Sequence, residues 1–293
     1  MIDALLGALL RGLFALMRAL GSRGAPAVGS FITRTLGPLT GAHRIARDNI
    51  AASFPEQDDA WRRAVLREAW DNLGRTTCEY VHMDAIWDYD PDAPSDDGRI
   101  LIAPEVVARF EALNNDGKPA LIFAAHLANW ELPMIAAAKH GLPAAALYRT
   151  PNIRAVAREI LAIRKGSMGE LIPAGQFAPL RMASALERGM HVGMLIDQRF
   201  GRGPRIQFLG REAAANPLIA QLARRFDCPV HGARAIRLPG GRFRLDLTEA
   251  IALPRDAEGL VDVAGATAAM NRVIEGWIRE YPGQWLWMHR KWR

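Results

Sequence analysis

Residues 117–141 read GKPALIFAAHLANWELPMIAAAKHG, and the pattern of this stretch decides the fold class. A turn signal that ends at Gly117 precedes Ala120–Ala125, a short continuous apolar run typical of a strand buried on both faces. Residues 127–140 are expected to be mostly helical, with Pro133 in the first turn and Gly141 as a C-cap. A strand followed directly by a helix is one unit of an α/β fold.

The same alternation continues along the chain. Further strands are expected at 100–102, 144–148, 170–174, 191–196, 229–237 and 242–248, and the last two are joined across Pro239-Gly240-Gly241. Further helices are expected at 57–85, 106–113, 153–165, 177–188, 214–225 and 264–280. We therefore predict an α/β protein with a largely parallel mixed sheet that is covered by helices on both faces.

The composition indicates a folded chain with an anionic partner. Half of the 293 residues are hydrophobic, which argues against a mainly disordered chain. The formal net charge of +6 suggests nucleic acid, an anionic membrane surface or an acidic substrate as the partner. The two cysteines, Cys78 and Cys228, form no CxxC pair and no zinc spacing, so we expect a reduced, cytosol-facing chain, with one buried disulfide as the alternative.

Residues 2–20 predict an amphipathic helix. Asp3, Gly7, Arg11 and Arg18 fall on one narrow stripe, and mostly leucines fill the broad remaining side. Arginines interrupt the apolar stretch, unlike in a signal peptide, and a central charge is costly in a transmembrane helix. A helix that lies in the membrane interface suits the pattern better, and a helix packed on the core of the protein is the alternative.

The basic segment after this helix supports the interfacial interpretation. Arginines at 23, 34, 44 and 47 would be attracted to anionic headgroups. We predict a membrane-associating helix in residues 1–24 and a single α/β domain in residues 25–293. Pro26, Gly29, Gly37 and Pro38 are expected to break up the segment that follows the first helix.

Several common catalytic motifs are absent from the sequence. It contains no GxSxG nucleophile elbow, no P-loop, no HExxH zinc helix and no GxGxxG after a strand. These absences argue against a serine hydrolase, a P-loop enzyme, a zincin and an ordinary dinucleotide binder. We expect neither a metal nor a cofactor.

His126 and Glu131 are the candidate catalytic pair. His126 follows the buried run and so emerges at the carboxyl end of a strand, the edge where open α/β sheets bind ligands. Glu131 lies near the start of the following helix, where a tight turn would fold its carboxylate back toward the imidazole. A carboxylate that accepts one ring N–H leaves the other ring nitrogen free to act as a base.

Spacing alone does not establish this pair. With seven histidines and 31 acidic residues, His-x4-acid pairs arise by chance, and the chain has a second one, His43 and Asp48. This second pair lacks a preceding strand, and we interpret it as an exposed surface pair. For His126 and Glu131 the alternative is a histidine bonded in the core beside a glutamate that the helix dipole favours.

A series of blocks resembles one bacterial family. HLANWE at 126–131 is similar to the H-x4-D/E motif of glycerolipid acyltransferases, in the NWE form of the late lipid A acyltransferases. YRTPN at 148–152, DQ at 197–198, FLG at 208–210 and PGQWLWMHRKW at 282–292 resemble further blocks of that family, in the expected order. Arg47-x-Asn49 and SFPE at 53–56 also look familial. One departure is Ala128, where glycine is common, and its methyl group could alter the turn.

The resemblance implies an acyltransferase on the cytoplasmic face of the inner membrane. Its donor would be acyl-acyl carrier protein, and its acceptor a hydroxyl of a lipid A precursor or related glycolipid. His126 would be the general base and Glu131 its partner. Either Arg149 or Arg164 would bind phosphate or stabilise the developing oxyanion. The substrate-binding residues implied by the family blocks are Arg149, Asn152, Arg164, Asp197, Gln198 and Arg199.

The C-terminal half offers two further sets of candidates. Trp285, Trp287 and Trp292 would pack in the core or lie at the level of the lipid headgroups. Arginines at 224, 225, 234, 237, 242 and 244 would form solvated faces or meet the acidic carrier protein.

Three other functions remain open from the sequence. An acyltransferase of the same superfamily could act on another glycolipid, an aminolipid or a lysophospholipid, because the motifs do not separate these acceptors. A basic nucleic-acid-binding protein fits the charge, but no recognised nucleic-acid motif appears, so we expect no nucleic-acid partner. An inactive membrane scaffold disagrees with the intact His126 and Glu131.

Overall fold

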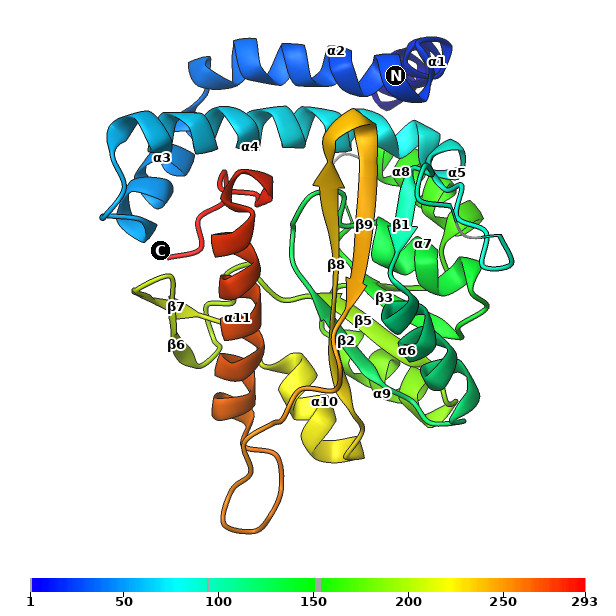
Figure 1. Ribbon diagram of the computed structural model, residues 1–293, viewed down its shortest axis with the longest axis vertical. Coiled ribbons are helices and arrows are strands. Elements are labelled where there is room, and N and C mark those ends of the chain that lie inside the picture. The colour runs from blue at the N-terminus through cyan, green and yellow to red at the C-terminus, as the bar shows by residue number, and fades with distance from the viewer. Residues whose placement is uncertain (1, 94, 151–153, 293) are drawn as a thin grey trace.

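A seven-stranded sheet forms the centre of the molecule, in the order β1-β9-β8-β2-β5-β3-β4 (Figure 1). The computed structural model describes residues 2–93, 95–150 and 154–292, and for residues 2–6, 154–155 and 165–167 it describes the backbone alone. The strands of the sheet are β1 (Ile100–Ile102), β2 (Leu121–Ala124), β3 (Ala144–Tyr148), β4 (Glu170–Pro173), β5 (His191–Leu195), β8 (Val230–Leu238) and β9 (Arg242–Leu247). A separate antiparallel hairpin pairs β6 (Arg205–Phe208) with β7 (Arg211–Ala214).

Helices cover both faces of the sheet, and two long helices cross one end of it (Figure 1). The N-terminal helices are α1 (Ile2–Ala19), α2 (Gly21–Leu36), α3 (Gly41–Ser53), α4 (Asp59–Glu79) and α5 (Met83–Ile86). The helices between the strands are α6 (Pro104–Asn115), α7 (Leu132–Lys139), α8 (Arg154–Ser167), α9 (Ala178–Glu187), α10 (Leu218–Phe226) and α11 (Val263–Glu280). Short 3-10 turns lie at Gly37–Leu39, Tyr80–His82, Pro239–Gly241 and Pro282–Gln284.

The sheet is mostly parallel, as predicted. The neighbouring strands β8, β2, β5, β3 and β4 run in one direction. β9 turns back from β8 as an antiparallel hairpin, and β1 lies parallel to β9. The carboxyl ends of five strands therefore meet at one edge, which is where a parallel sheet collects its ligand-binding loops.

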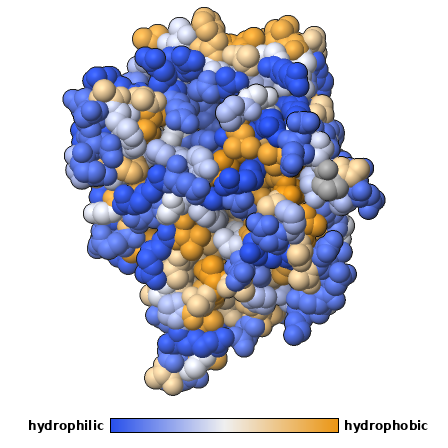
Figure 2. Space-filling view, viewed as in Figure 1, coloured by the Kyte–Doolittle hydropathy of each residue, from blue (hydrophilic) through white to orange (hydrophobic). Residues whose placement is uncertain are grey.

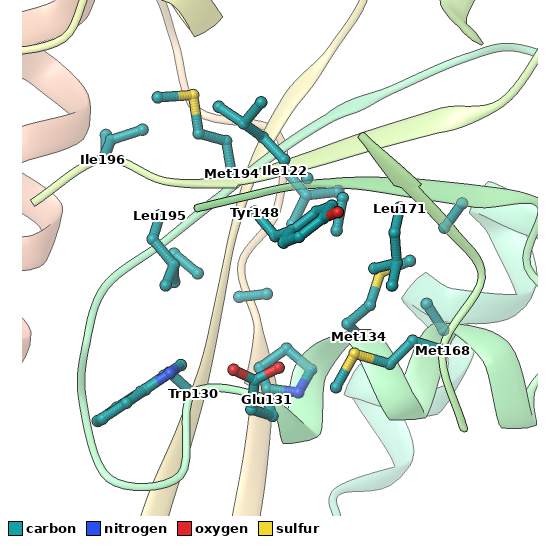
Figure 3. A pocket seen from close by; sticks show the side chains of 18 of the residues that line it. Ile122, Trp130, Glu131, Met134, Tyr148, Met168, Leu171, Met194, Leu195 and Ile196 are labelled. Carbon is teal, nitrogen blue, oxygen red and sulfur yellow. The ribbon is translucent and has the colours of Figure 1, made fainter. Parts of the chain in front are cut away.

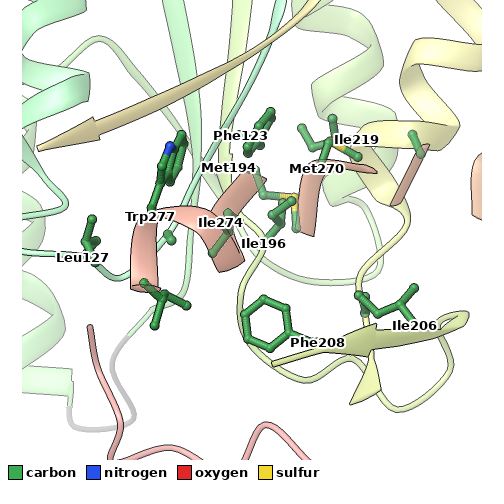
Figure 4. Close-up of a cluster of buried hydrophobic side chains, with 14 of the residues drawn as sticks. Phe123, Leu127, Met194, Ile196, Ile206, Phe208, Ile219, Met270, Ile274 and Trp277 are labelled. Carbon is green, nitrogen blue, oxygen red and sulfur yellow. The ribbon is translucent and has the colours of Figure 1, made fainter. Parts of the chain in front are cut away.

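The two faces of the sheet carry separate hydrophobic cores. Phe123 and Met194 point to one face, where they pack with Met270 and Ile274 of α11 (Figure 4). The opposite face packs against α6 and α7, with Ile135 fully buried. β2 is bonded to strands on both sides, so a continuous apolar run is what its position requires.

The predicted break after the first helix is wrong at Pro26 and Gly29 but confirmed at Gly37 and Pro38, where the helix ends and a 3-10 turn follows. α2 runs without interruption from Gly21 to Leu36 and contains Pro26. Its Gly29 faces Gly74 of α4 so closely that a Cβ on either residue would collide with the backbone carbonyl of the other. Glycine serves here for close helix packing, and that packing outweighs its poor helix propensity.

Two boundaries also differ from the sequence prediction. α7 begins at Leu132, five residues later than expected, because residues 127–131 form an irregular turn before Pro133, which lies in the first helical turn as predicted. α10 begins at Leu218, since the residues before it include β7 of a hairpin that the alternation pattern did not indicate.

The N-terminal helices expose much of their apolar side (Figure 2). Leu9, Leu16 and Phe31 are 71%, 59% and 70% exposed. α1 also contacts α8, and Arg11 lies 3.6 Å from Glu159 there. In the described part of the chain, no helix is both long enough and apolar enough to span a membrane. The predicted boundary at residue 24 falls inside α2, and the division into two parts stays a prediction.

Candidate active site

His126 and Asp197 meet at the carboxyl edge of the sheet. β2 and β5 are parallel neighbours in which Ala124 lies opposite Leu195, and His126 and Asp197 each follow two residues later. Asp197 Oδ1 lies 2.8 Å from Nδ1 of His126, and Asp197 Oδ2 accepts the backbone N–H of His126 at 2.9 Å. Strand register therefore brings together two residues that are 71 positions apart in the sequence.

The carboxylate of Asp197 fixes the protonation of the imidazole. Asp197 is fully buried, and its second oxygen also accepts the indole N–H of Trp285 at 2.8 Å. Burial alone would raise the pKa of Asp197, but the charge and hydrogen bonds of His126 hold it well below its usual range. An ionised carboxylate only accepts hydrogen bonds, so Nδ1 of His126 carries a proton, and in the neutral tautomer of the ring the lone pair is therefore on Nε2.

Nε2 of His126 faces a cavity. The His126 side chain retains 16% exposure, and the amide nitrogen of Gln198 lies 3.3 Å from Nε2 of the ring. His126 and Gln198 both line a cavity of about 640 Å³. An imidazole oriented by a carboxylate, with its other nitrogen open to a pocket, is the arrangement of a general base.

Glu131 does not contact the histidine ring through a hydrogen bond, so the expected pairing of these two side chains is wrong. Arg164 Nε donates to Glu131 Oε2 at 3.1 Å, and Tyr80 donates to Glu131 Oε1. Arg164 also lies 3.0 Å from the Tyr80 hydroxyl. Burial alone would lower the pKa of Arg164, but the charge of Glu131 raises it above its ordinary value. Glu131 directly precedes α7 and lines the same cavity, yet Asp197 occupies the position beside His126 that was predicted for Glu131.

The turn between His126 and α7 explains this exchange. Ala128 has a φ of 47°, in the left-handed region that favours glycine, and its N–H donates to the carbonyl of Gln284 at 2.9 Å. Its carbonyl accepts the hydroxyl of Thr76 at 3.0 Å. The turn is thus held from two sides, and it directs the Glu131 carboxylate toward α8 and away from the imidazole.

The walls of the cavity are largely apolar (Figure 3), and the exposed Arg149 and Arg199 mark its mouth. Trp130 and Glu131 lie at one end, and Met134, Met168 and Leu171 line a side wall. Further lining residues come from the strands: Ile122, Ala144, Ala146, Gly193 and Met194. Its volume falls in the usual range for small-molecule sites, and its walls suit a hydrocarbon chain.

The remaining predicted substrate-binding residues gather around the mouth, with one exception. Arg149 and Arg199 are exposed and line the cavity, and neither forms an ion pair among the described residues. Arg164 lines the cavity but is already bonded to Glu131 and Tyr80. Asn152 lies outside the described residues.

A match to a protein-family model identifies the family of the chain. The family model described as bacterial lipid A biosynthesis acyltransferase matches residues 4–293. The chain belongs to this family. No curated protein matches the chain significantly. Membership of the family makes the protein an acyltransferase, as the sequence blocks implied.

In this acyltransferase the C-terminal block packs behind the His126–Asp197 pair, where Trp285 donates to Asp197. Trp285 and Trp287 are buried, so the headgroup position considered for them is wrong. The ring of His289 meets that of Trp285 edge to face, with centroids 5.0 Å apart, and burial lowers the pKa of His289 to about 4. Lys291 is fully buried over the ring of Phe208, 4.8 Å from its centroid, and burial lowers its pKa to about 8.

Two residues of the acyltransferase site escaped the sequence prediction for different reasons. Trp285 stands in a block that resembles the family, so its position was indicated but its bond to Asp197 was not. Tyr80 lies at the end of α4, where no motif marks it, and only the fold brings it to Glu131. Within the described ranges, no group of three or more histidine, cysteine, aspartate or glutamate side chains could hold a metal ion.

Proposed function

We propose that this acyltransferase moves a fatty acyl chain from acyl-acyl carrier protein to a hydroxyl of a lipid A precursor. The observation that carries the proposal is the orientation of His126: Asp197 accepts the N–H of Nδ1, and Nε2 lies at the cavity beside the side-chain amide of Gln198. Membership of the lipid A acyltransferase family supports the substrate class. The carrier-protein donor is what the family resemblance implies, and the role of each residue is inferred from the chemistry that the site permits.

The proposed step balances with the two substrates alone. Nε2 of His126 removes the proton from the acceptor hydroxyl, and the oxygen attacks the thioester carbonyl carbon. The tetrahedral intermediate expels the thiolate, which takes the proton back from His126. Asp197 stabilises the transient imidazolium, and Gln198, Arg149 or Arg199 would donate to the developing oxyanion. A general base in this position typically accelerates the reaction about 10²–10⁴-fold.

The other walls of the cavity suit the acyl chain of the donor and the phosphate groups of the acceptor. The apolar interior along β3 and β5 would hold the acyl chain that is transferred. The exposed Arg149 and Arg199 at the mouth would meet the phosphate groups of a lipid A precursor. The Glu131–Arg164 pair would form a rigid wall between these two regions.

We further propose that the enzyme works at the cytoplasmic face of the inner membrane, with residues 1–24 contributing to membrane association. The exposed apolar side chains of α1 and α2 support this placement. They lie beside an arginine-rich segment, a combination that favours an anionic lipid surface.

Acyl transfer by the full-length protein tests the proposal. The protein would be incubated with lauroyl- or myristoyl-acyl carrier protein and a tetra-acylated lipid A precursor, and the lipid would be weighed by mass spectrometry. We expect the mass of one acyl chain to be added. Transfer to a lysophospholipid but not to the lipid A precursor would show that the enzyme uses the alternative acceptor. No transfer to either lipid would contradict the proposed acyl transfer.

A further inference from the structure

A second cavity lies where α2, α3 and the first half of α4 meet (Figure 1), and none of its lining residues lines the cavity at His126. Its volume is about 550 Å³. Tyr80, which lines the first cavity, follows the other end of α4, about 20 Å from Arg67 at the rise of an α-helix. Five arginines line this cavity: Arg34, Arg47, Arg62, Arg63 and Arg67.

Three of these arginines already have carboxylate neighbours. Arg47 lies 2.9 Å from Asp48, and Arg62 lies 3.2 Å from Asp59 on the cavity wall. Arg62 is fixed further, because its guanidinium donates to two backbone carbonyls of the loop before α4. Arg34 lies 3.9 Å from Asp71, which itself binds other partners.

Arg63 and Arg67 have no such neighbour. Within the part of the chain that the structure describes, neither side chain forms an ion pair or a hydrogen bond. They stand four residues apart on α4, so their like charges face the same cavity and repel each other. Two unpaired guanidinium groups in one concave site favour an anion with several oxygen acceptors.

His43 adds a neutral donor to the same wall. Trp70 donates its indole N–H to Nδ1 of His43 at 3.1 Å, so this ring nitrogen is the unprotonated one in the neutral side chain. The proton of the neutral ring then lies on Nε2. The predicted surface pair of His43 with Asp48 is wrong, because Asp48 binds Arg47 and His43 belongs to this cavity.

Apolar side chains stand at the rim of this basic cavity. Leu36 is 54% exposed and Leu39 is 82% exposed, and they flank Pro38, which lines the cavity. Phe31 also lies on α2, five residues before Leu36, and it is 70% exposed. A purely ionic partner gains nothing from these side chains, whereas an amphiphile matches both the arginines and the leucines.

We propose that this cavity binds the phosphate of an anionic phospholipid headgroup, whose acyl chains lie against Leu36 and Leu39. The inference rests on the membrane association proposed above and adds a discrete lipid site to it. The two cavities share no lining residue, so the bound lipid is distinct from the substrates at His126. It would fix the orientation of the enzyme on the membrane, with the two long helices α2 and α4 against the surface.

Vesicle binding by charge-matched variants tests this site. The variant R63Q/R67Q removes the two unpaired charges from the cavity. The control R18Q/R44Q removes two exposed arginines from the same basic region that do not line it. Each full-length protein is titrated with phosphatidylcholine vesicles and with vesicles that also contain phosphatidylglycerol. Free inorganic phosphate serves as the competitor that separates a soluble anion from a headgroup.

We expect R63Q/R67Q to bind the phosphatidylglycerol vesicles at least about tenfold more weakly than R18Q/R44Q, because contacts within a cavity are stronger than diffuse attraction. Free phosphate should not displace the vesicles. Equal losses in both variants would overturn the lipid site and leave the membrane proposal intact. Loss of carrier-protein binding with vesicle binding retained would overturn it in favour of a protein partner. No vesicle binding by the unmodified protein would overturn both proposals.

Discussion

At the residue scale, Asp197 is the positioning residue on which the histidine depends. Its two oxygens hold the ring N–H and the backbone N–H of His126, so Asp197→Asn would favour the wrong tautomer. We expect kcat to fall by about 10²–10⁴ with little change in KM. Steady-state kinetics with a folded variant would check this, and a variant with full activity would rule out the His126–Asp197 base.

Glu131 should behave differently, because it is paired with Arg164. Glu131→Gln leaves a buried guanidinium without its counter-charge, which should lower the free energy of unfolding by about 3–5 kcal/mol. Denaturant unfolding would measure the loss, and replacing Arg164 by Gln in the same chain should recover most of it. If Glu131→Gln instead keeps the stability of the unmodified protein and lowers kcat as much as Asp197→Asn does, then Glu131 acts on His126 directly.

Lys291 gives the fold a defined pH dependence. Burial lowers its pKa to about 8, whereas the unfolded chain keeps a value near 10.5, so between these pH values only the unfolded chain holds the proton. The stability of the protein should therefore rise with pH across this window. Lys291→Met removes the buried charge and should stabilise the fold at pH 7 by up to roughly 3 kcal/mol.

Thermal unfolding of both proteins from pH 6 to 10.5 would check this prediction. The advantage of Lys291→Met should shrink as the pH rises above about 8. An advantage that does not change with pH would mean that the ammonium group is not the cause.

Individual residues also mark the limit of the sequence prediction. His126 could be placed because it follows a buried apolar run, and Asp197 because it stands in a familiar block. The contact between these two side chains could not be predicted, because it depends on β2 and β5 being neighbours and on the register in which they pair. Glu131 has the expected spacing, but the left-handed turn at Ala128 and the distant Tyr80 and Arg164 decide its partner.

At the element scale, the close crossing of α2 and α4 is a testable feature. Gly74→Ala would drive a methyl group into the Gly29 carbonyl, so we expect a loss of about 2–3 kcal/mol in the free energy of unfolding. Gly276→Ala is the matched control, because a Cβ at this exposed position of α11 meets nothing within 4 Å. The control should gain about 0.5–1 kcal/mol from helix propensity. Similar effects at both positions in chemical denaturation would contradict the close packing.

The elements themselves were predicted unevenly, for physical reasons. β1 and β3 have the predicted limits, since short apolar runs between turn signals leave few alternatives. The helix through Pro26 and the hairpin β6–β7 were missed, because tertiary packing rather than local propensity holds them.

At the scale of the whole molecule, the cavity between the strands and α7 should limit the length of the acyl chain. Gly193 of β5 lines it, and a Cβ there would meet nothing closer than 3.9 Å, so Gly193→Val should fold and fill part of the space. We expect kcat/KM for long acyl donors to fall about tenfold or more, with short donors as the internal control. Assays over a series of donor lengths would show this, and equal losses at every length would mean that the chain lies elsewhere.

The lipid A of a strain that lacks this gene tests the central claim most directly. Mass spectrometry should show lipid A that lacks one secondary acyl chain, and the unmodified gene should restore it. A gene that carries Asp197→Asn should not, although its protein is present at normal amounts. Unchanged lipid A in the deletion strain, or full restoration by Asp197→Asn, would contradict the account of a lipid A acyltransferase whose base is His126 held by Asp197.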